Sequence, residues 1–243
     1  MLMIHQAARS SEQDTVISLH LPDLSQPADV PLLDVLATRL TRAPVNSLAP
    51  RDQLFREGDH KANICQVLDG AVVLYRLLPD GRRQVTGFAV TGDMVGLGSG
   101  TRHRCSAEAS GDAMVRALPA ITLHSMANED SHLGMRLYDA ISQELATTQD
   151  LLMTVGRLNA AERVATFLLN ISERNSRARR PAQRIELPMT RCDIADFLGL
   201  TTETVSRTLT KLANGNIISR HSGHICILSI EALEDVAAGD QRI

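Results

Sequence analysis

The sequence predicts an α+β protein in which a β-barrel is followed by a long helix and then by a winged helix-turn-helix. Three observations lead to this fold class. Glycines recur every 11 or 12 residues from Gly58 to Gly92 between short apolar runs, which is the turn spacing of an all-β barrel or sandwich. Hydrophobic residues then recur at alternating three- and four-residue steps between Leu133 and Leu158. Two amphipathic segments finally meet at Gly199, ahead of an apolar hairpin.

The first half of the chain is expected to hold an extension and the barrel. Residues 1–30 lack clear periodicity, so we expect an extension with little structure of its own. Residues 31–125 are assigned to the barrel domain, with a short helix at Pro31–Thr41 before the strands. Pro79-Asp80-Gly81 predicts a hairpin turn, because proline fixes φ and glycine accepts a positive φ. The apolar runs expected to supply strands are Val67–Leu68, Ala71–Tyr75, Val85–Val90 and Met114–Leu118.

Residues 126–158 are assigned to a dimerisation helix. Its stripe is narrow, which is typical of a coiled-coil seam and not of a broad globular face, so it predicts a parallel two-fold homodimer. The alternative is a helix that packs only on its own domain. Leu137, Leu151 and Leu158 flank the stripe and can dock on the barrel. The residues of the stripe are Tyr138, Ile141, Leu145, Thr148, Leu152 and Val155.

Residues 159–243 are assigned to a winged helix-turn-helix domain. An amphipathic helix is expected at Ala160–Ser172, a short strand at Ile185–Leu187, and a hairpin around Ser222-Gly223 after the helix pair. Thr190 and Asp193 have the spacing of a capping box at the start of the first helix of the pair.

The second helix of the pair has the pattern of a DNA-reading helix. Its apolar side chains would point inward, while Thr202, Glu203, Ser206 and Arg207 would point outward. Arginine can donate two hydrogen bonds to guanine, glutamate can accept from cytosine, and small hydroxyl side chains can meet thymine. An ordinary surface helix pair is the alternative. The residues expected beside DNA phosphates are Thr190, Arg191, Thr201, Thr204 and Lys211.

Charge and composition fit this interpretation and exclude several others. The chain of 243 residues has a net charge of −3, yet ten Lys/Arg against five Asp/Glu make the segment from Arg163 to Arg220 net positive. Aromatic residues are 2% of the chain with no Trp, so stacking on single-stranded nucleic acid is not expected. No apolar run approaches the roughly 20 residues of a membrane span, and no signal peptide is evident, so a cytoplasmic location is expected.

The order of barrel, long helix and winged helix resembles the Crp/Fnr superfamily of bacterial transcription regulators, and most of all its FixK branch. The resemblance covers about residues 45–230. It implies a cyclic-nucleotide-binding-like double-stranded jelly roll, a palindromic TTGA-N6-TCAA-like site, and contact with RNA polymerase through exposed barrel loops, with Asp80, Arg82 and Arg83 as candidates. It also implies an activator of low-oxygen or nitrogen-fixation genes. The motifs that carry it include Leu54–Asp59, Gly92–Gly96, Ala161–Leu168 and Glu203-x-x-Ser206-Arg207.

The same resemblance implies that no cofactor is bound. Cyclic-AMP-binding members carry Gly-Glu-Leu and then Arg-Ser, whereas this chain has Gly96-Leu97 and Cys105-Ser106. The first 64 residues contain no cysteine for an iron–sulfur cluster, and only scattered histidines are available for haem. The four cysteines form no Cys-x-x-Cys pair, and we expect no histidine at metal spacing from them, so no metal is expected. The alternative is a regulator whose barrel must first bind an unidentified small molecule.

Two further functions, a redox switch and a metal oxygenase, can be tested against individual residues of the sequence. Cys192 lies in the first turn of the first helix of the pair, where the helix dipole and Arg191 would favour a reactive thiolate. It is therefore a candidate redox switch, with an inert half-buried thiol as the alternative. A metal oxygenase built on the barrel would need two clustered histidines and an acid. His103 and Glu108 lack a second close histidine, so the sequence does not predict an enzyme.

Overall fold

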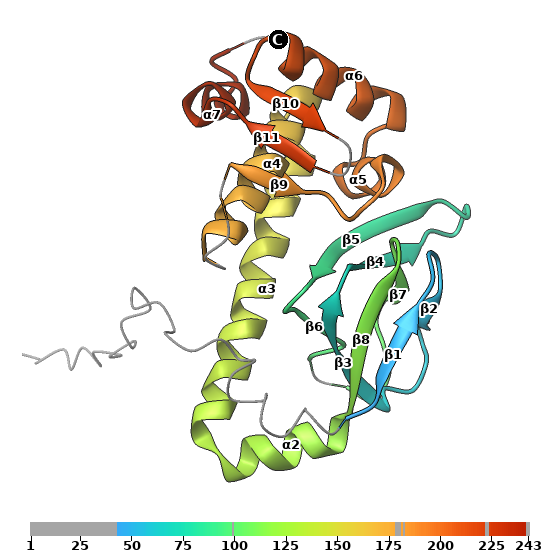
Figure 1. The fold of residues 1–243 in the computed structure, drawn as a ribbon. Coiled ribbons are helices and arrows are strands. Elements are labelled where there is room, and N and C mark those ends of the chain that lie inside the picture. Colours follow the sequence, from blue (N-terminus) through green and yellow to red (C-terminus); the bar gives the residue numbers. More distant parts are fainter. Residues whose placement is uncertain (1–42, 99, 178–180, 182, 222–223, 242–243) are drawn as a thin grey trace, which may run out of the picture.

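The structure is a computed structural model that describes residues 43–243 except residues 99, 178–180, 182, 222–223 and 242–243. The expected N-terminal extension and the expected Pro31–Thr41 helix lie outside the described residues. Figure 1 shows a barrel, a long helix that runs alongside it, and a compact domain at the far end of that helix. Among the described residues, no helix has both the length and the apolar character needed to cross a membrane.

The barrel consists of two four-stranded antiparallel sheets, with strand orders β1-β8-β3-β6 and β2-β7-β4-β5. Its core is aliphatic, and Val67, Val72 and Val115 are fully buried between the sheets. Gly70 joins β3 to β4 with φ of +76°, and a Cβ there would collide with the backbone of Asp112. The strands are β1 Val45–Leu48, β2 Gln53–Phe55, β3 Asn63–Asp69, β4 Ala71–Leu77, β5 Arg83–Val90, β6 Met94–Val95, β7 Ser106–Ala109 and β8 Ala113–Pro119.

Two helices follow the barrel. Helix α2 (Ala120–Glu129) leads into α3 (Ser131–Arg157), which at 27 residues is about 40 Å long. Asp130 caps α3 by accepting hydrogen bonds from the backbone N–H groups of His132 and Leu133. Leu133 is buried with Ile64 and Leu118 of the barrel, and Leu137 packs against the same cluster. The first turns of α3 are therefore anchored on the barrel, as expected for Leu137.

The C-terminal domain is a winged helix-turn-helix with the largest core of the molecule. Phe167, Ile185 and Leu212 lie in this core, together with Leu233 of a final helix, α7, that the sequence reasoning did not predict. Strands β10, β11 and β9 form an antiparallel sheet in that order. The elements are α4 Ala160–Arg177, β9 Arg184–Glu186, α5 Arg191–Leu198, α6 Thr202–Asn214, β10 Ile218–His221, β11 His224–Ile227 and α7 Ile230–Ala238.

The barrel and the C-terminal domain pack directly on each other. Three of the four phenylalanines of the chain meet where β5 approaches α4 and α5. The ring centroid of Phe88 lies 5.1 Å from that of Phe197 and 6.2 Å from that of Phe167. The side-chain amide of Gln84 donates to the carbonyl oxygen of Asp196 (2.8 Å). This apolar and polar contact fixes α5 against strand β5.

Candidate DNA-binding site

Helices α5 and α6 form the predicted helix-turn-helix. The Thr190 hydroxyl accepts from the backbone N–H of Asp193 (3.1 Å), and the Asp193 carboxylate accepts from that of Thr190 (3.0 Å), which completes the capping box. Gly199 ends α5 with φ of +63°, the left-handed conformation expected of it. Arg163 of α4 donates to the carbonyl oxygen of Leu198 (2.9 Å), so a side chain from the domain core supports the turn.

Helix α6 presents the residues predicted to read bases. Thr201 caps it by accepting from the N–H of Thr204 (3.1 Å). Its inner face buries Val205, Leu209 and Leu212. On the outer face, Thr202, Glu203 and Arg207 are exposed and Ser206 is half-buried at the edge.

The outer faces of α5 and α6 are linked through polar side chains. The Arg191 guanidinium lies at hydrogen-bond distance from the Ser206 hydroxyl (3.5 Å), and that of Arg207 lies 3.9 Å from the Glu203 carboxylate. In the wing, Arg220 donates to the Thr210 hydroxyl of α6 (2.9 Å). One surface therefore combines the start of α5, the outer face of α6 and the wing.

The residues predicted to contact DNA phosphates lie around this surface. Thr190, Arg191, Thr201 and Lys211 are exposed and Thr204 is half-buried. The hydroxyls of Thr190, Thr201 and Thr204 already take part in the capping of α5 and α6.

Cys192 is exposed in the first turn of α5. Its sulfur lies 4.0 Å from the Asp196 carboxylate, while the neighbouring Arg191 is directed toward Ser206 of α6. The thiol is accessible, which is the property that a redox site requires.

The side of α5 that faces the barrel carries a buried ion cluster that sequence reasoning did not find. The Arg83 guanidinium of β5 binds Glu108 of β7 (2.6 Å), Asp196 (3.1 Å) and the fully buried Asp193. Ser110 also donates to Asp193 (3.0 Å). Burial alone would raise the pKa of Asp193, but hydrogen bonds from Thr190, Arg83 and Ser110 outweigh it and hold this pKa below its ordinary value.

This cluster revises the role expected of Arg83. The sequence places it in an exposed loop with Asp80 and Arg82, but its side chain is only 15% exposed and joins the two domains. Asp80 and Arg82 do occupy the exposed β4–β5 turn, where they bind each other. Only these two remain as candidate surface contacts of that loop.

The face of the barrel next to α3 carries charged side chains of both signs around Cys105. Leu97 packs in the apolar cluster below α3, and Lys61 donates to the carbonyl oxygen of Gly98 (3.0 Å). Burial raises the pKa of the Cys105 thiol, and the charge of Glu144 on α3 raises it further. An acidic side chain therefore lies near the place where the resemblance would put a cyclic phosphate.

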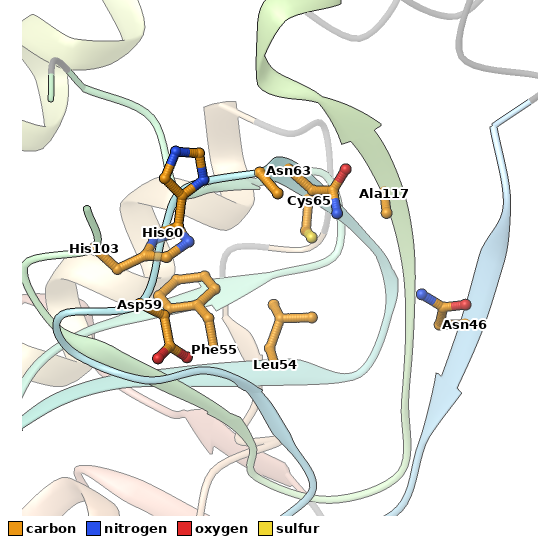
Figure 2. A pocket seen from close by; sticks show the side chains of 10 residues that line it. Asn46, Leu54, Phe55, Asp59, His60, Asn63, Cys65, His103 and Ala117 are labelled. Atoms are coloured by element: carbon orange, nitrogen blue, oxygen red, sulfur yellow. The ribbon is translucent and has the colours of Figure 1, made fainter. Parts of the chain in front are cut away.

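A cavity of about 240 Å³ lies at one end of the barrel (Figure 2). The His103 imidazole stacks on the Phe55 ring with centroids 3.6 Å apart. Burial and the nearby Lys61 lower the pKa of His103, which favours its neutral form. The cavity is smaller than the roughly 300–1,000 Å³ of typical small-molecule sites.

Comparison with known proteins matches both parts of this architecture. Residues 45–130 match the cyclic nucleotide-binding domain, and residues 162–236 match the Crp-like helix-turn-helix domain. The nitrogen fixation regulation protein FixK of Bradyrhizobium diazoefficiens is 40% identical over 187 residues, which cover 77% of this chain and 79% of that protein. The transcriptional activatory protein AadR of Rhodopseudomonas palustris is 38% identical over 190 residues, covering 78% and 79%.

A solved structure agrees with these matches. The structure of FixK2 from Bradyrhizobium japonicum superimposes with a TM-score of 0.74 at 37% identity and covers 80% of this chain and 96% of that one. These relatives confirm the predicted fold class, and they confirm a regulator of transcription in place of an enzyme. The chain belongs to the Crp/Fnr family of DNA-binding transcription regulators, in its FixK-like branch.

Proposed function

We propose that this chain is a homodimeric regulator that binds a two-fold symmetric TTGA-N6-TCAA-like site without a cyclic nucleotide. The observation that carries the proposal is the outer face of α6, where Glu203 and Arg207 are exposed while the inner face is fixed in the core. In the major groove, Arg207 would donate to guanine O6 and N7, and Glu203 would accept from cytosine N4. Ser206 and Thr202 would lie beside a thymine.

Polar and charged groups around the outer face of α6 would fix the position of the protein along the DNA duplex. Arg191, at the start of α5, and Lys211, on α6, carry positive charge on either side of the reading face. The N-termini of both helices add partial positive charge toward DNA phosphates. We assign phosphate contacts to these two side chains and to Thr190, Thr201 and Thr204, because such contacts position a protein without selecting a sequence.

The exposed stripe on α3 supports a dimer. Tyr138, Leu145 and Leu152 leave 61%, 59% and 74% of their surface exposed, which is unusual for such side chains at regular spacing on one helix. Ile141 and Thr148 lie on the same exposed stripe. A parallel pairing of two α3 helices would cover it and hold two α6 helices about 34 Å apart, one turn of DNA.

Val155 differs from the rest of the stripe. It is half-buried, and one of its methyl groups would be 3.5 Å from a Cβ placed on Gly199, so it faces its own helix-turn-helix. We therefore assign Tyr138 to Leu152 to the seam, and Val155 to the contact between α3 and α5.

Independence from cyclic nucleotides is supported by charge. Leu97 replaces the acid that holds a ribose in nucleotide-binding relatives, and no arginine precedes Ser106 directly. The proposed regulator acts in the cytoplasm and activates low-oxygen or nitrogen-fixation genes. Asp80 and Arg82 would contact RNA polymerase.

Redox control through Cys192 is a further part of this proposal. Two molecules of hydrogen peroxide would oxidise the exposed thiol to a sulfinate, with release of two water molecules and one proton, and would so place a negative charge near DNA phosphates. Peroxide should lower operator affinity in the wild type and leave that of Cys192→Ser unchanged. An equal loss in both proteins would remove Cys192 from the mechanism.

The decisive experiment measures the affinity of reduced protein for a TTGA-N6-TCAA duplex and for a scrambled duplex at one salt concentration. Tight and selective binding without additives supports the proposal. The second candidate, a regulator gated by a small molecule, is favoured by the cavity next to His103. It predicts weak binding that improves when a ligand enters that cavity.

A further inference from the structure

The wing carries a cluster of metal-binding side chains that neither the fold nor DNA reading requires. Along β11, Ile225 and Ile227 point into the core, while His224 and Cys226 are half-buried on the other face of the sheet. His221 is the cross-strand partner of His224 on β10. Strand pairing thus brings together three residues that the sequence analysis did not recognise as having metal spacing.

The geometry of these three residues is compact. One donor atom from each of His221, His224 and Cys226 lies within 4.8 Å of the other two. The two imidazole rings stack with centroids 4.7 Å apart and an angle of 11° between their planes. Tetrahedral Zn²⁺ with ligands at about 2.0–2.3 Å needs donor separations of roughly 3.5 Å, so small side-chain rotations suffice.

Neighbouring strands add groups suited to support such a site. Glu186 of β9 is the cross-strand partner of His224, and Arg184 is that of Cys226. The Glu186 carboxylate is exposed and can supply a fourth oxygen ligand. The Ser219 hydroxyl lies 3.2 Å from Nε2 of His221, which is the kind of contact that orients a ligating imidazole.

We propose that the wing binds one Zn²⁺ through His221, His224 and Cys226, with Glu186 or water as the fourth ligand. Two imidazoles and a thiolate form a borderline-to-soft donor set, which suits Zn²⁺ and disfavours Mg²⁺ and Ca²⁺. On binding, the Cys226 thiol releases its proton to solvent. The site does not depend on the proposed operator.

Zinc would link the two strands of the wing at the end where the chain passes from β10 to β11. Arg220, next to His221, donates to Thr210 of α6, so the position of the hairpin is linked to that of the DNA-reading helix. Zinc should therefore restrain the wing and change the affinity for DNA outside the base-reading positions. This consequence rests on the proposed function, whereas metal binding itself does not.

The test is a titration of reduced, metal-free full-length protein with Co²⁺ followed by competition with Zn²⁺. We expect one ion per chain, a thiolate-to-cobalt charge-transfer absorption, and displacement of cobalt by Zn²⁺. Cys226→Ser should abolish that absorption. His221→Ala and His224→Ala should each weaken binding by more than about tenfold, because even loss of a supporting group costs about 10–100-fold.

Matched controls separate this site from surface binding. Cys192→Ser removes an exposed thiol outside the wing, and His132→Ala removes an exposed histidine of α3, so both should leave the titration unchanged. His221 is exposed, so its substitution should not disturb the fold. Unchanged cobalt absorption in Cys226→Ser, or no binding by the wild type, would overturn the proposal, whatever the operator assay shows.

Discussion

The two helices of the helix-turn-helix lie in opposite environments. On α5, Asp193 and Asp196 face the barrel and are held by Arg83. On α6, Glu203 and Arg207 face solvent, and their charged groups lie 3.9 Å apart. The two carboxylates of α5 therefore hold the domain in place, whereas Glu203 and Arg207 of α6 remain available for a partner. Charged side chains thus fix the position of α5 on the barrel, whereas on α6 they are exposed for recognition of a partner.

Removing the central cation of α5's ion cluster should have the largest effect on stability. Arg83→Met removes the guanidinium that binds Asp193, which is 0% exposed, and Glu108, which is 10% exposed. Arg51 remains 3.7 Å from the Asp193 carboxylate and 2.6 Å from that of Glu108, so it compensates part of the lost charge. Breaking a buried pair from one side costs about 3–5 kcal/mol, so the free energy of unfolding should fall by about 3 kcal/mol, the lower end of that range. Urea denaturation measures it.

The control for Arg83 is an exposed ion pair of the same barrel. Arg76 binds Glu57 at the surface, and Arg76→Met should lower stability far less than Arg83→Met, because solvent screens an exposed ion pair. Equal losses in the two variants would show that the Arg83 cluster is no more than a surface contact.

The dimer seam extends the comparison from α5 and α6 to the two faces of α3. Leu137 packs on the barrel, whereas Leu145 is exposed. Leu145→Glu should weaken the dimer by about 3 kcal/mol, roughly a hundredfold, since each of two leucines contributes at least about 1.5 kcal/mol when buried. Sedimentation equilibrium measures it. Gln143→Glu adds the same charge off the stripe and should leave the dimer intact.

Local patterns account for what could be predicted from the sequence. The spacing of Thr190 and Asp193, and the glycine at position 199, place the helix-turn-helix because caps and turns depend on near neighbours. The partner of Asp193 is Arg83, 110 residues away, and no local pattern reports such a contact. The packing of Phe88 on Phe197 was missed for the same reason.

The wing cluster and the last helix were missed although a signal was present. A hairpin predicted around Ser222-Gly223 would place His221 opposite His224, with Cys226 two residues further on the same face, and the structure does pair His221 with His224. Likewise Ser229 before α7 and Gly239 after it are ordinary start and stop residues of a helix.

Substitution of Arg207 should affect DNA binding and not stability, whereas substitution of Arg83 should affect stability. Arg207→Ala removes an exposed side chain, so stability should change by less than about 0.5 kcal/mol. Operator affinity should fall by about 1–3 kcal/mol per half-site, with relaxed preference at the guanine. Arg104→Ala, an exposed arginine of the barrel, is the control for charge. If Arg207→Ala lost equal affinity for operator and for scrambled DNA, Arg207 would be a phosphate contact. If Arg104→Ala lost as much affinity as Arg207→Ala, the loss would reflect overall charge.

The smallest effect expected is the pH dependence that Asp193 adds. The pKa of this carboxyl is below its ordinary value in the folded protein, because hydrogen bonds from Thr190, Arg83 and Ser110 exceed the cost of burial. A carboxyl with a lowered pKa stabilises the fold above its unfolded pKa of about 3.9, and this stabilisation is lost as pH falls through the folded pKa. Unfolding measured from pH 6 down to about pH 2 should show a fall in stability below about pH 4.

Asp193→Asn should be less stable at neutral pH, and its stability should depend less steeply on pH in that window. Glu203→Gln should match the wild-type slope, because the Glu203 carboxylate is exposed on α6. An unchanged slope in Asp193→Asn would mean that the difference between α5 and α6 rests on packing and not on charge.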